Sequence, residues 1–190
     1  TRPPSPVTPA TEAPSLARPE APPRPPEVLH WWVSGGATFS GGIEPGAAWG
    51  LAVATELRWP AAGVGLGLRF DPPSTTSAGA GLLRAWLVAG SALLCGRAQW
   101  FAVFGVGSLG VRGASGVDFD QEVSAMSTYA AAGLRVTGDW SLGRDWAVVV
   151  SAEASRSLIG VDAVVDDKVV WASPPVGLLA GVALAWRPMD

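Results

Sequence analysis

The feature that most constrains the fold is an alternation of large apolar residues with small ones in several short segments. In the last of these segments, one face carries Val176, Leu178, Ala180, Val182, Leu184 and Trp186. The opposite face carries Gly177, Leu179, Gly181, Ala183, Ala185 and Arg187. A repeat of two residues is that of a β-strand and not of a helix. The same repeat at 47–59 and 63–71 therefore predicts an all-β protein.

About eight such segments follow one another after residue 28, and β-branched, aromatic and glycine residues dominate them. They are expected at 29–40, 47–59, 63–71, 79–93, 99–111, 128–140, 146–157 and 175–187. Segments of roughly 8–13 residues have the length that a tilted membrane strand needs. The longest apolar stretches are interrupted by glycine and fall short of the roughly 20 residues of a spanning helix.

The smaller face of these strands does not suit a protein surface in water. It is rich in glycine and alanine, and only 15% of the whole chain is charged. A soluble barrel or sandwich would turn a generously polar face outward. We therefore expect the large apolar residues to face lipid and the small and charged residues to fill a narrow interior. Residues 99–111 alternate too poorly for their faces to be assigned.

The connections give independent support for an eight-stranded meander. Long loops are expected at 41–46, 72–78, 112–127 and 158–174, and they alternate with tight turns near 60–62, 94–98 and 141–145. Alternate connections in a meander lie at the same end, so long loops gather at one end of a barrel and tight turns at the other.

The tryptophans also follow this division. Seven of the ten tryptophans fall at strand ends on the tight-turn side, which predicts an aromatic belt at a membrane interface. The predicted belt consists of Trp31, Trp32, Trp59, Trp100, Trp140, Trp146 and Trp186.

A separate segment precedes the strands. Residues 1–27 contain ten of the 17 prolines and none of the 24 glycines. Such a segment buries too little apolar surface to fold and favours extended polyproline II, so we expect a disordered tether. The domain boundaries are thus 1–27 for the tether and 28–190 for the barrel. Because the chain starts at Thr1 without a signal-peptide pattern, a signal or a further domain is expected upstream.

Several charged residues fall on the small face and are predicted to form a charge network in the barrel lumen. They are Glu56, Arg58, Arg69, Arg84, Arg135, Asp139 and Glu153. Charges in a dry interior must pair, and an eight-stranded barrel only just holds its own side chains, so a plugged lumen is expected rather than an open pore. A turn at 141–145 sets Trp140 opposite Trp146. Arg135 and Glu153 then become diagonal neighbours that form a salt bridge.

Residues 28–188 resemble the small eight-stranded bacterial outer-membrane barrels of the OmpA/OmpX type. The resemblance is carried by the number of strands, the alternation of residues, the alternation of long loops with tight turns, and the tryptophan belt. The resemblance covers about 160 residues and rests on architecture, not on an invariant motif. It implies residence in the outer membrane, with lipids as partners and residues 1–27 in the periplasm. Members of this family usually end in an aromatic residue, whereas here Trp186 is followed by four more residues.

The sequence gives little support for catalysis, and no enzyme activity is expected. His30 is the only histidine, and it opens the first strand on the tight-turn side, where an interfacial residue fits better than a member of a catalytic triad. The acidic loop residues match no cation-binding spacing, and no Cys/His cluster exists, so no metal or cofactor is expected. A net charge of −3 gives no reason to expect a nucleic acid as partner.

The favoured interpretation is a non-enzymatic outer-membrane barrel that acts as a membrane anchor or a surface-exposed structural or interaction protein. A monomer is favoured, and the tether is available for a periplasmic or N-terminal partner. Two alternatives remain open. One is a lipid hydrolase or acyltransferase of the same barrel size, and the other is a soluble lipocalin-like binder of hydrophobic ligands.

Overall fold

The computed structural model of the chain describes residues 29–78, 81–98, 101–117, 124–165 and 168–188. The predicted tether at 1–27 and the predicted belt residue Trp100 lie outside these ranges. In the part that is described, no helix is long and apolar enough to cross a membrane.

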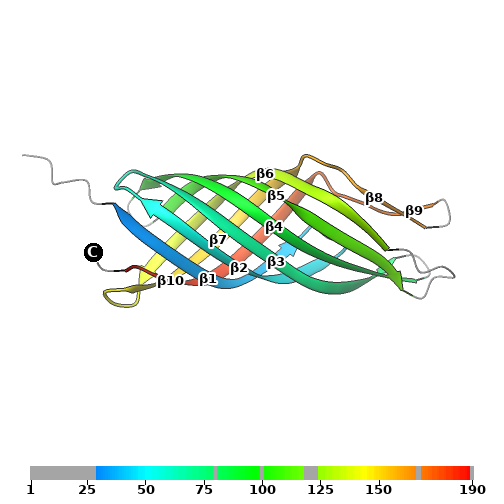
Figure 1. The fold of residues 1–190 in the computed structure, drawn as a ribbon, viewed down its shortest axis with the longest axis horizontal. Coiled ribbons are helices and arrows are strands. Elements are labelled where there is room, and N and C mark those ends of the chain that lie inside the picture. Colours follow the sequence, from blue (N-terminus) through cyan, green and yellow to red (C-terminus); the bar gives the residue numbers. More distant parts are fainter. Residues whose placement is uncertain (1–28, 79–80, 99–100, 118–123, 166–167, 189–190) are drawn as a thin grey trace, which may run out of the picture.

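Eight strands form one closed antiparallel barrel, as predicted (Figure 1). They are β1 (His30–Gly41), β2 (Ala47–Arg58), β3 (Ala62–Ala78), β4 (Gly81–Ala98), β5 (Phe101–Val117), β6 (Ser124–Ser141), β7 (Trp146–Ser157) and β10 (Val176–Trp186). Each strand pairs with its neighbour in this order, and β10 pairs with β1 to close the ring. The remaining strands, β8 (Asp162–Val165) and β9 (Lys168–Ala172), form a separate hairpin between β7 and β10.

Three connections differ from those predicted. The loop expected at 112–127 is shorter, because β5 continues to Val117 and β6 begins at Ser124. Residues 72–78 were expected to form a loop because of Pro72 and Pro73, yet β3 continues to Ala78 and pairs with β4 through a register shift between Asp71 and Ser74. The last residue of β3 that pairs with β2 is Phe70, so the prolines lie where they interrupt no ladder on that side. Residues 94–98, expected to form a turn, are the end of β4.

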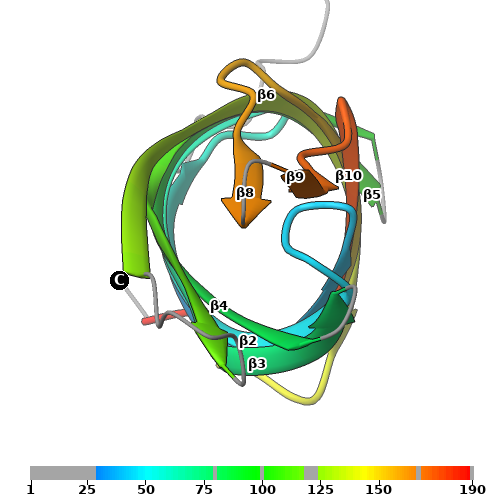
Figure 2. The ribbon, with the colours of Figure 1, turned by 90° about the vertical axis from the view of Figure 1, so that its right-hand side faces the viewer.

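The four central strands are longer than the rest as a result. Strands β3 to β6 have 17 or 18 residues, whereas β1, β2, β7 and β10 have 11 or 12. At about 3.3 Å per residue, the five to seven extra residues lengthen these strands by roughly 17–23 Å along their own direction. The extension lies at the end that carries the longer connections, and we call this the long-loop end. Figure 2 looks into it and shows β8, β9 and the β1–β2 connection across the opening.

The barrel exterior is apolar, as the alternation predicts. Leu66 and Leu68 on β3 are 64% and 59% exposed, and Leu178 and Val182 on β10 are 62% and 57% exposed. Ordinary soluble proteins do not expose so continuous an apolar surface, whereas a barrel in lipid requires one.

The faces of β5, which the sequence left unassigned, are now defined. Phe101 and Val103 point outward, whereas Phe104 is 1% exposed and packs inside with Leu93 and Cys95. A large aromatic ring therefore fills the interior here, which breaks the rule of small residues inside and explains why the alternation was weak.

Gly36 shows why some inward positions must be glycine. A Cβ atom at Gly36 would overlap the backbone of Val182 and Ala183 on β10, where the first and last strands meet. The seam of the barrel thus brings two backbones into direct contact.

Candidate functional site in the barrel interior

Six of the seven charged residues assigned to the lumen lie on inward positions: Glu56, Arg58, Arg69, Arg135, Asp139 and Glu153. Arg84 does not. Its side chain is exposed, while its neighbours Leu83 and Ala85 are buried and face inward. The assignment of Arg84 to the lumen is wrong, because on β4 large residues such as Leu83 and Leu87 occupy the inner face and the size rule fails.

At the end that carries the tight turns, which we call the short-turn end, one carboxylate links two opposite walls. Asp139 on β6 accepts hydrogen bonds on Oδ2 from Arg58 of β2 at 3.1 Å and from Arg97 of β4 at 2.6 Å. Arg58 also pairs with Glu56 at 2.8 Å, and its side chain is only 6% exposed. This cluster closes the lumen across its width.

Trp32 lies in the same cluster and not in the aromatic belt. It is 6% exposed, and the guanidinium carbon of Arg58 sits 3.7 Å from its ring centroid. Successive residues of a strand point to opposite faces, so Trp31 and Trp32 cannot both face lipid. The prediction for Trp32 is therefore wrong.

The other described tryptophans of the predicted belt divide into two groups. Trp31, Trp140, Trp146 and Trp186 are between 42% and 56% exposed on the outer surface at the short-turn end. Trp186 lies directly opposite Trp146. Trp59 is half-buried in the turn between β2 and β3 and lines a cavity at the mouth.

In the middle of the barrel, Arg135 on β6 and Glu153 on β7 form the ion pair that the sequence predicts. Nε and Nη2 of Arg135 lie 2.9 Å and 2.7 Å from Oε2 of Glu153. The predicted register was off by two residues, because Trp140 lies opposite Val148 and not Trp146. The two charged residues are therefore direct cross-strand partners instead of diagonal ones.

These side chains leave little free volume in the lumen. The central cavity is about 80 Å³, and Ser34, Thr137, Ser151 and Glu153 are among the residues that line it. A space of this size holds only a few water molecules.

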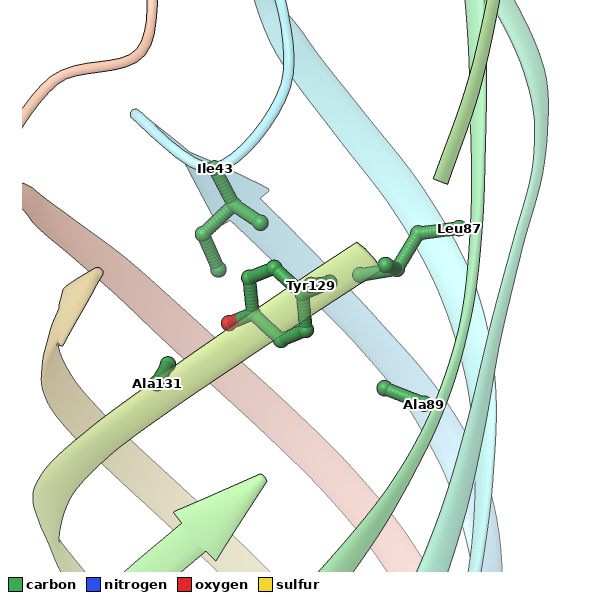
Figure 3. Close-up of a cluster of buried hydrophobic side chains, with 5 residues drawn as sticks. All are labelled: Ile43, Leu87, Ala89, Tyr129 and Ala131. Carbon is green, nitrogen blue, oxygen red and sulfur yellow. The ribbon is translucent and has the colours of Figure 1, made fainter. Parts of the chain in front are cut away.

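At the long-loop end, the β1–β2 connection folds into the barrel. Ile43 packs against Leu87, Ala89, Tyr129 and Ala131 from β4 and β6 (Figure 3). The connection turns at two glycines in the left-handed region, Gly42 with φ 76° and Gly46 with φ 87°, so the sequence permits this inward fold. We call residues 42–46 the plug loop.

The plug loop also buries a carboxylate. Glu44 is 3% exposed, and neither of its carboxylate oxygens has a hydrogen-bond partner. Burial, and secondarily the nearby Asp71, raise the pKa of Glu44 to about 7. Asp71 itself is fully buried and bonded to Arg69 through both oxygens.

Arg112 on β5 anchors the connection that contains β8 and β9. It donates hydrogen bonds to Ser127 on the wall at 3.1 Å, to Ser173 at 3.3 Å and to the backbone carbonyl of Ile159 at 3.1 Å. Two connections at the long-loop end are thus held from within the barrel.

The sequence interpretation missed several interior groups that it could have found in part. Asp71 lies two residues after Arg69, and Tyr129 lies six residues before Arg135. Each is therefore on the same face of its strand as that arginine, so the alternation already placed both inside. Arg97 and Arg112 were missed because the sequence pattern predicts a turn and a loop where they lie. The burial of Glu44 has no signal in the sequence.

The arrangement offers no catalytic constellation in the described ranges. His30 is exposed at the start of β1, at the opposite end from the plug loop. Within those ranges, no group of three or more His, Cys, Asp or Glu side chains could hold a metal ion. The loop residues Asp118, Asp120, Glu122, Asp166 and Asp167 lie outside them.

Comparison with known proteins identifies the fold. No family model and no curated protein matches the chain. A major outer-membrane protein of Thermus thermophilus is similar over 85% of this chain and 100% of its own, with a TM-score of 0.59 and 15% identity. Ail, the attachment invasion locus protein of Yersinia pestis, is similar over 84% of this chain and 97% of its own, with a TM-score of 0.50 and 11% identity. The chain thus has the fold of the small outer-membrane β-barrels, as its sequence pattern predicted.

Proposed function

We propose that this chain is a non-enzymatic integral outer-membrane protein that serves as a membrane anchor or as a surface-exposed structural or interaction protein. The observation that carries the proposal is the combination of an apolar exterior with a filled interior. Outward residues such as Leu109 and Leu134 are 69% and 63% exposed, whereas the lumen retains a cavity of about 80 Å³. Lipid is the solvent that such an exterior fits, and so narrow a lumen passes no solute.

The interaction role draws support from the long-loop end. The wall formed by β3 to β6 extends beyond the other four strands at this end. The polar outward residues Thr75, Ser77 and Arg84 lie on this extension. We propose that the long-loop end faces the cell exterior, so that the extension of β3 to β6 is exposed there. Residues 1–27 then lie in the periplasm, where they serve as a tether for a further partner. The outer-membrane lipids are its immediate partners, and we propose a monomer.

The two alternatives receive less support. A lipid hydrolase that uses a Ser–His pair would need His30, which lies at the end away from the proposed exterior. A soluble lipocalin-like binder would turn its apolar side chains inward, contrary to the exposure of Leu66, Leu68 and Leu178.

The test begins with a membrane preparation washed at high pH. The barrel should stay in the pellet and should migrate differently on gels before and after boiling, because a closed sheet has no free edge at which to unravel. Purified protein in a planar bilayer should give no steady conductance and should release no fatty acid from phospholipid. Quantitative release by the alkaline wash would overturn the membrane assignment, and lipid hydrolysis would overturn the non-enzymatic one.

A further inference from the structure

The short-turn mouth contains a cup of unusual composition. It has a volume of about 380 Å³ and is lined by His30, Trp32, Arg58, Trp59, Pro60, Arg97 and Arg187. Three guanidinium groups, one imidazole and two indole rings thus face a single concavity, and none of the described residues that line it is acidic.

The three arginines converge on one side chain. Their guanidinium carbons lie 3.7 Å (Arg58), 5.0 Å (Arg187) and 5.9 Å (Arg97) from the ring centroid of Trp32. The indole face stabilises each cation and holds it in place without neutralising it. Cations fixed in this way keep donor groups available for a ligand at the mouth.

The two acidic residues behind the cup form ion pairs with only two of its three arginines. Glu56 and Asp139 pair with Arg58 and Arg97. Arg187 has only neutral acceptors, the hydroxyl of Ser141 at 3.2 Å and the carbonyl of Gly143 at 3.4 Å.

Arg187 also has a hydrogen-bond donor without a partner. Its Nε is buried and makes no hydrogen bond. The neighbouring Asp145 accepts the backbone N–H of Arg187 on its own backbone carbonyl, and its buried Oδ1 has no hydrogen-bond partner. Among the described residues, the Arg187 guanidinium thus lacks a carboxylate at ion-pair distance.

We propose that this cup is a binding site for a phosphate group. A phosphate offers three acceptor oxygens in a tetrahedral arrangement and can receive donors from several arginines at once, whereas a planar carboxylate is satisfied by a single guanidinium fork. The indole walls and Pro60 leave space for an uncharged glycerol or sugar attached to it. The phosphate can come from a phospholipid headgroup of the adjoining leaflet or from a soluble phosphate ester.

The experiment uses the full chain refolded in an uncharged detergent. Inorganic phosphate and glycerol phosphate, compared with chloride at equal ionic strength, should raise the urea midpoint of unfolding, because a ligand that binds only the folded state stabilises it. The line width of the ³¹P NMR signal reports binding directly. Mixed micelles with phosphatidylglycerol, compared with diacylglycerol, distinguish the sources. A lipid site responds to phosphatidylglycerol at concentrations at which glycerol phosphate has no effect.

The variants Arg187→Gln and Arg97→Gln should each weaken phosphate binding by about tenfold or more, as expected for loss of a charge-assisted hydrogen bond. Arg84→Gln removes the same charge from the outer surface and should bind like the parent chain. If Arg187→Gln does not refold, Arg97→Gln still provides the test, since Asp139 keeps Arg58 as its partner. The proposal is overturned if neither form of phosphate binds, or if the cup variants bind as tightly as Arg84→Gln.

Discussion

The buried carboxyl group of the plug loop gives the protein a pH dependence that can be worked out from its surroundings. Burial, and secondarily Asp71, raise the pKa of Glu44 from 4.5 to about 7 in the folded state. A raised carboxyl pKa means that the folded state prefers the protonated form. Stability from this group is therefore complete below about pH 4.5 and is lost as the pH rises through about 7. The shift corresponds to about 3 kcal/mol at most.

The perturbation that isolates this effect is Glu44→Gln, which keeps the shape of the side chain and cannot ionise. The groups that face Glu44 are Asp71, Arg69 and Ser74 on β3 and Arg112 on β5, and they are unchanged in the variant. The variant and the parent should have similar unfolding free energies near pH 4. Near pH 8 the variant should be more stable by up to about 3 kcal/mol.

The plug loop can also respond to ionisation of Glu44 by opening, which lowers the observed difference in unfolding free energy between variant and parent. If turning outward at Gly42 and Gly46 costs less than burying the ionised carboxylate, the loop opens while the barrel stays folded. Amide hydrogen exchange in residues 42–46, corrected for the intrinsic effect of pH, should then accelerate above pH 7 in the parent and not in the variant.

Urea unfolding in lipid between pH 4 and 8, together with exchange of the loop amides, measures both responses. Asp162→Asn removes an exposed carboxylate from β8 and serves as the control. Parallel stability profiles for parent and variant, with no difference in loop exchange, would refute the reasoning.

Three further predictions concern other parts of the chain. Replacing Arg135 or Glu153 alone by a neutral residue should destabilise the barrel by roughly 3–5 kcal/mol, and the double variant should recover part of the loss. A double-mutant cycle on urea unfolding measures this, and strictly additive effects would show that the pair does not interact. Arg84→Gln should change the same unfolding free energy by less than about 0.5 kcal/mol, since the side chain points away from the lumen, and a loss as large as that of Arg135 would contradict its outward position. Deletion of residues 1–26 should leave folding and insertion intact on unboiled gels, and failure to insert would place the tail within the folded unit.

The strand repeat was sufficient to predict the barrel, because lipid outside and a narrow lumen inside leave few arrangements for alternating residues. It identified the faces of β2, β3 and β10, on which large and small residues separate clearly. It gave the wrong face for Arg84 on β4 and no assignment for β5, because Leu87 and Phe104 fill the interior there. Side-chain size there no longer reports which face meets lipid, so Arg84 was placed on the wrong side.

The ends of elements and the loops were harder to predict, for a different physical reason. Pro72 and Pro73 indicate a loop by local propensity, but the strand continues around them. Both prolines lie beyond the last residue that pairs with β2 and within the register shift between Asp71 and Ser74, so neither edge needs their missing N–H groups. The inward fold of the plug loop depends on space left by Leu87, Ala89 and Tyr129, which are distant in sequence. The pair Arg135–Glu153 was predictable despite the register error, because both residues share a face on adjacent strands.

The position of Asp139 also bears on how long the folded protein survives. Ion pairs such as Arg135–Glu153 join adjacent strands and can form as soon as a hairpin does. Asp139 instead bonds to Arg58 and Arg97 on strands that are not its neighbours in the sheet. The bond to Arg58 joins β6 to β2 on the opposite wall, so it requires the sheet to have rolled up. Interactions that form after the folding transition state leave the folding rate unchanged and slow unfolding. We therefore expect Asp139 to slow the unfolding of the barrel more than it affects the rate of assembly.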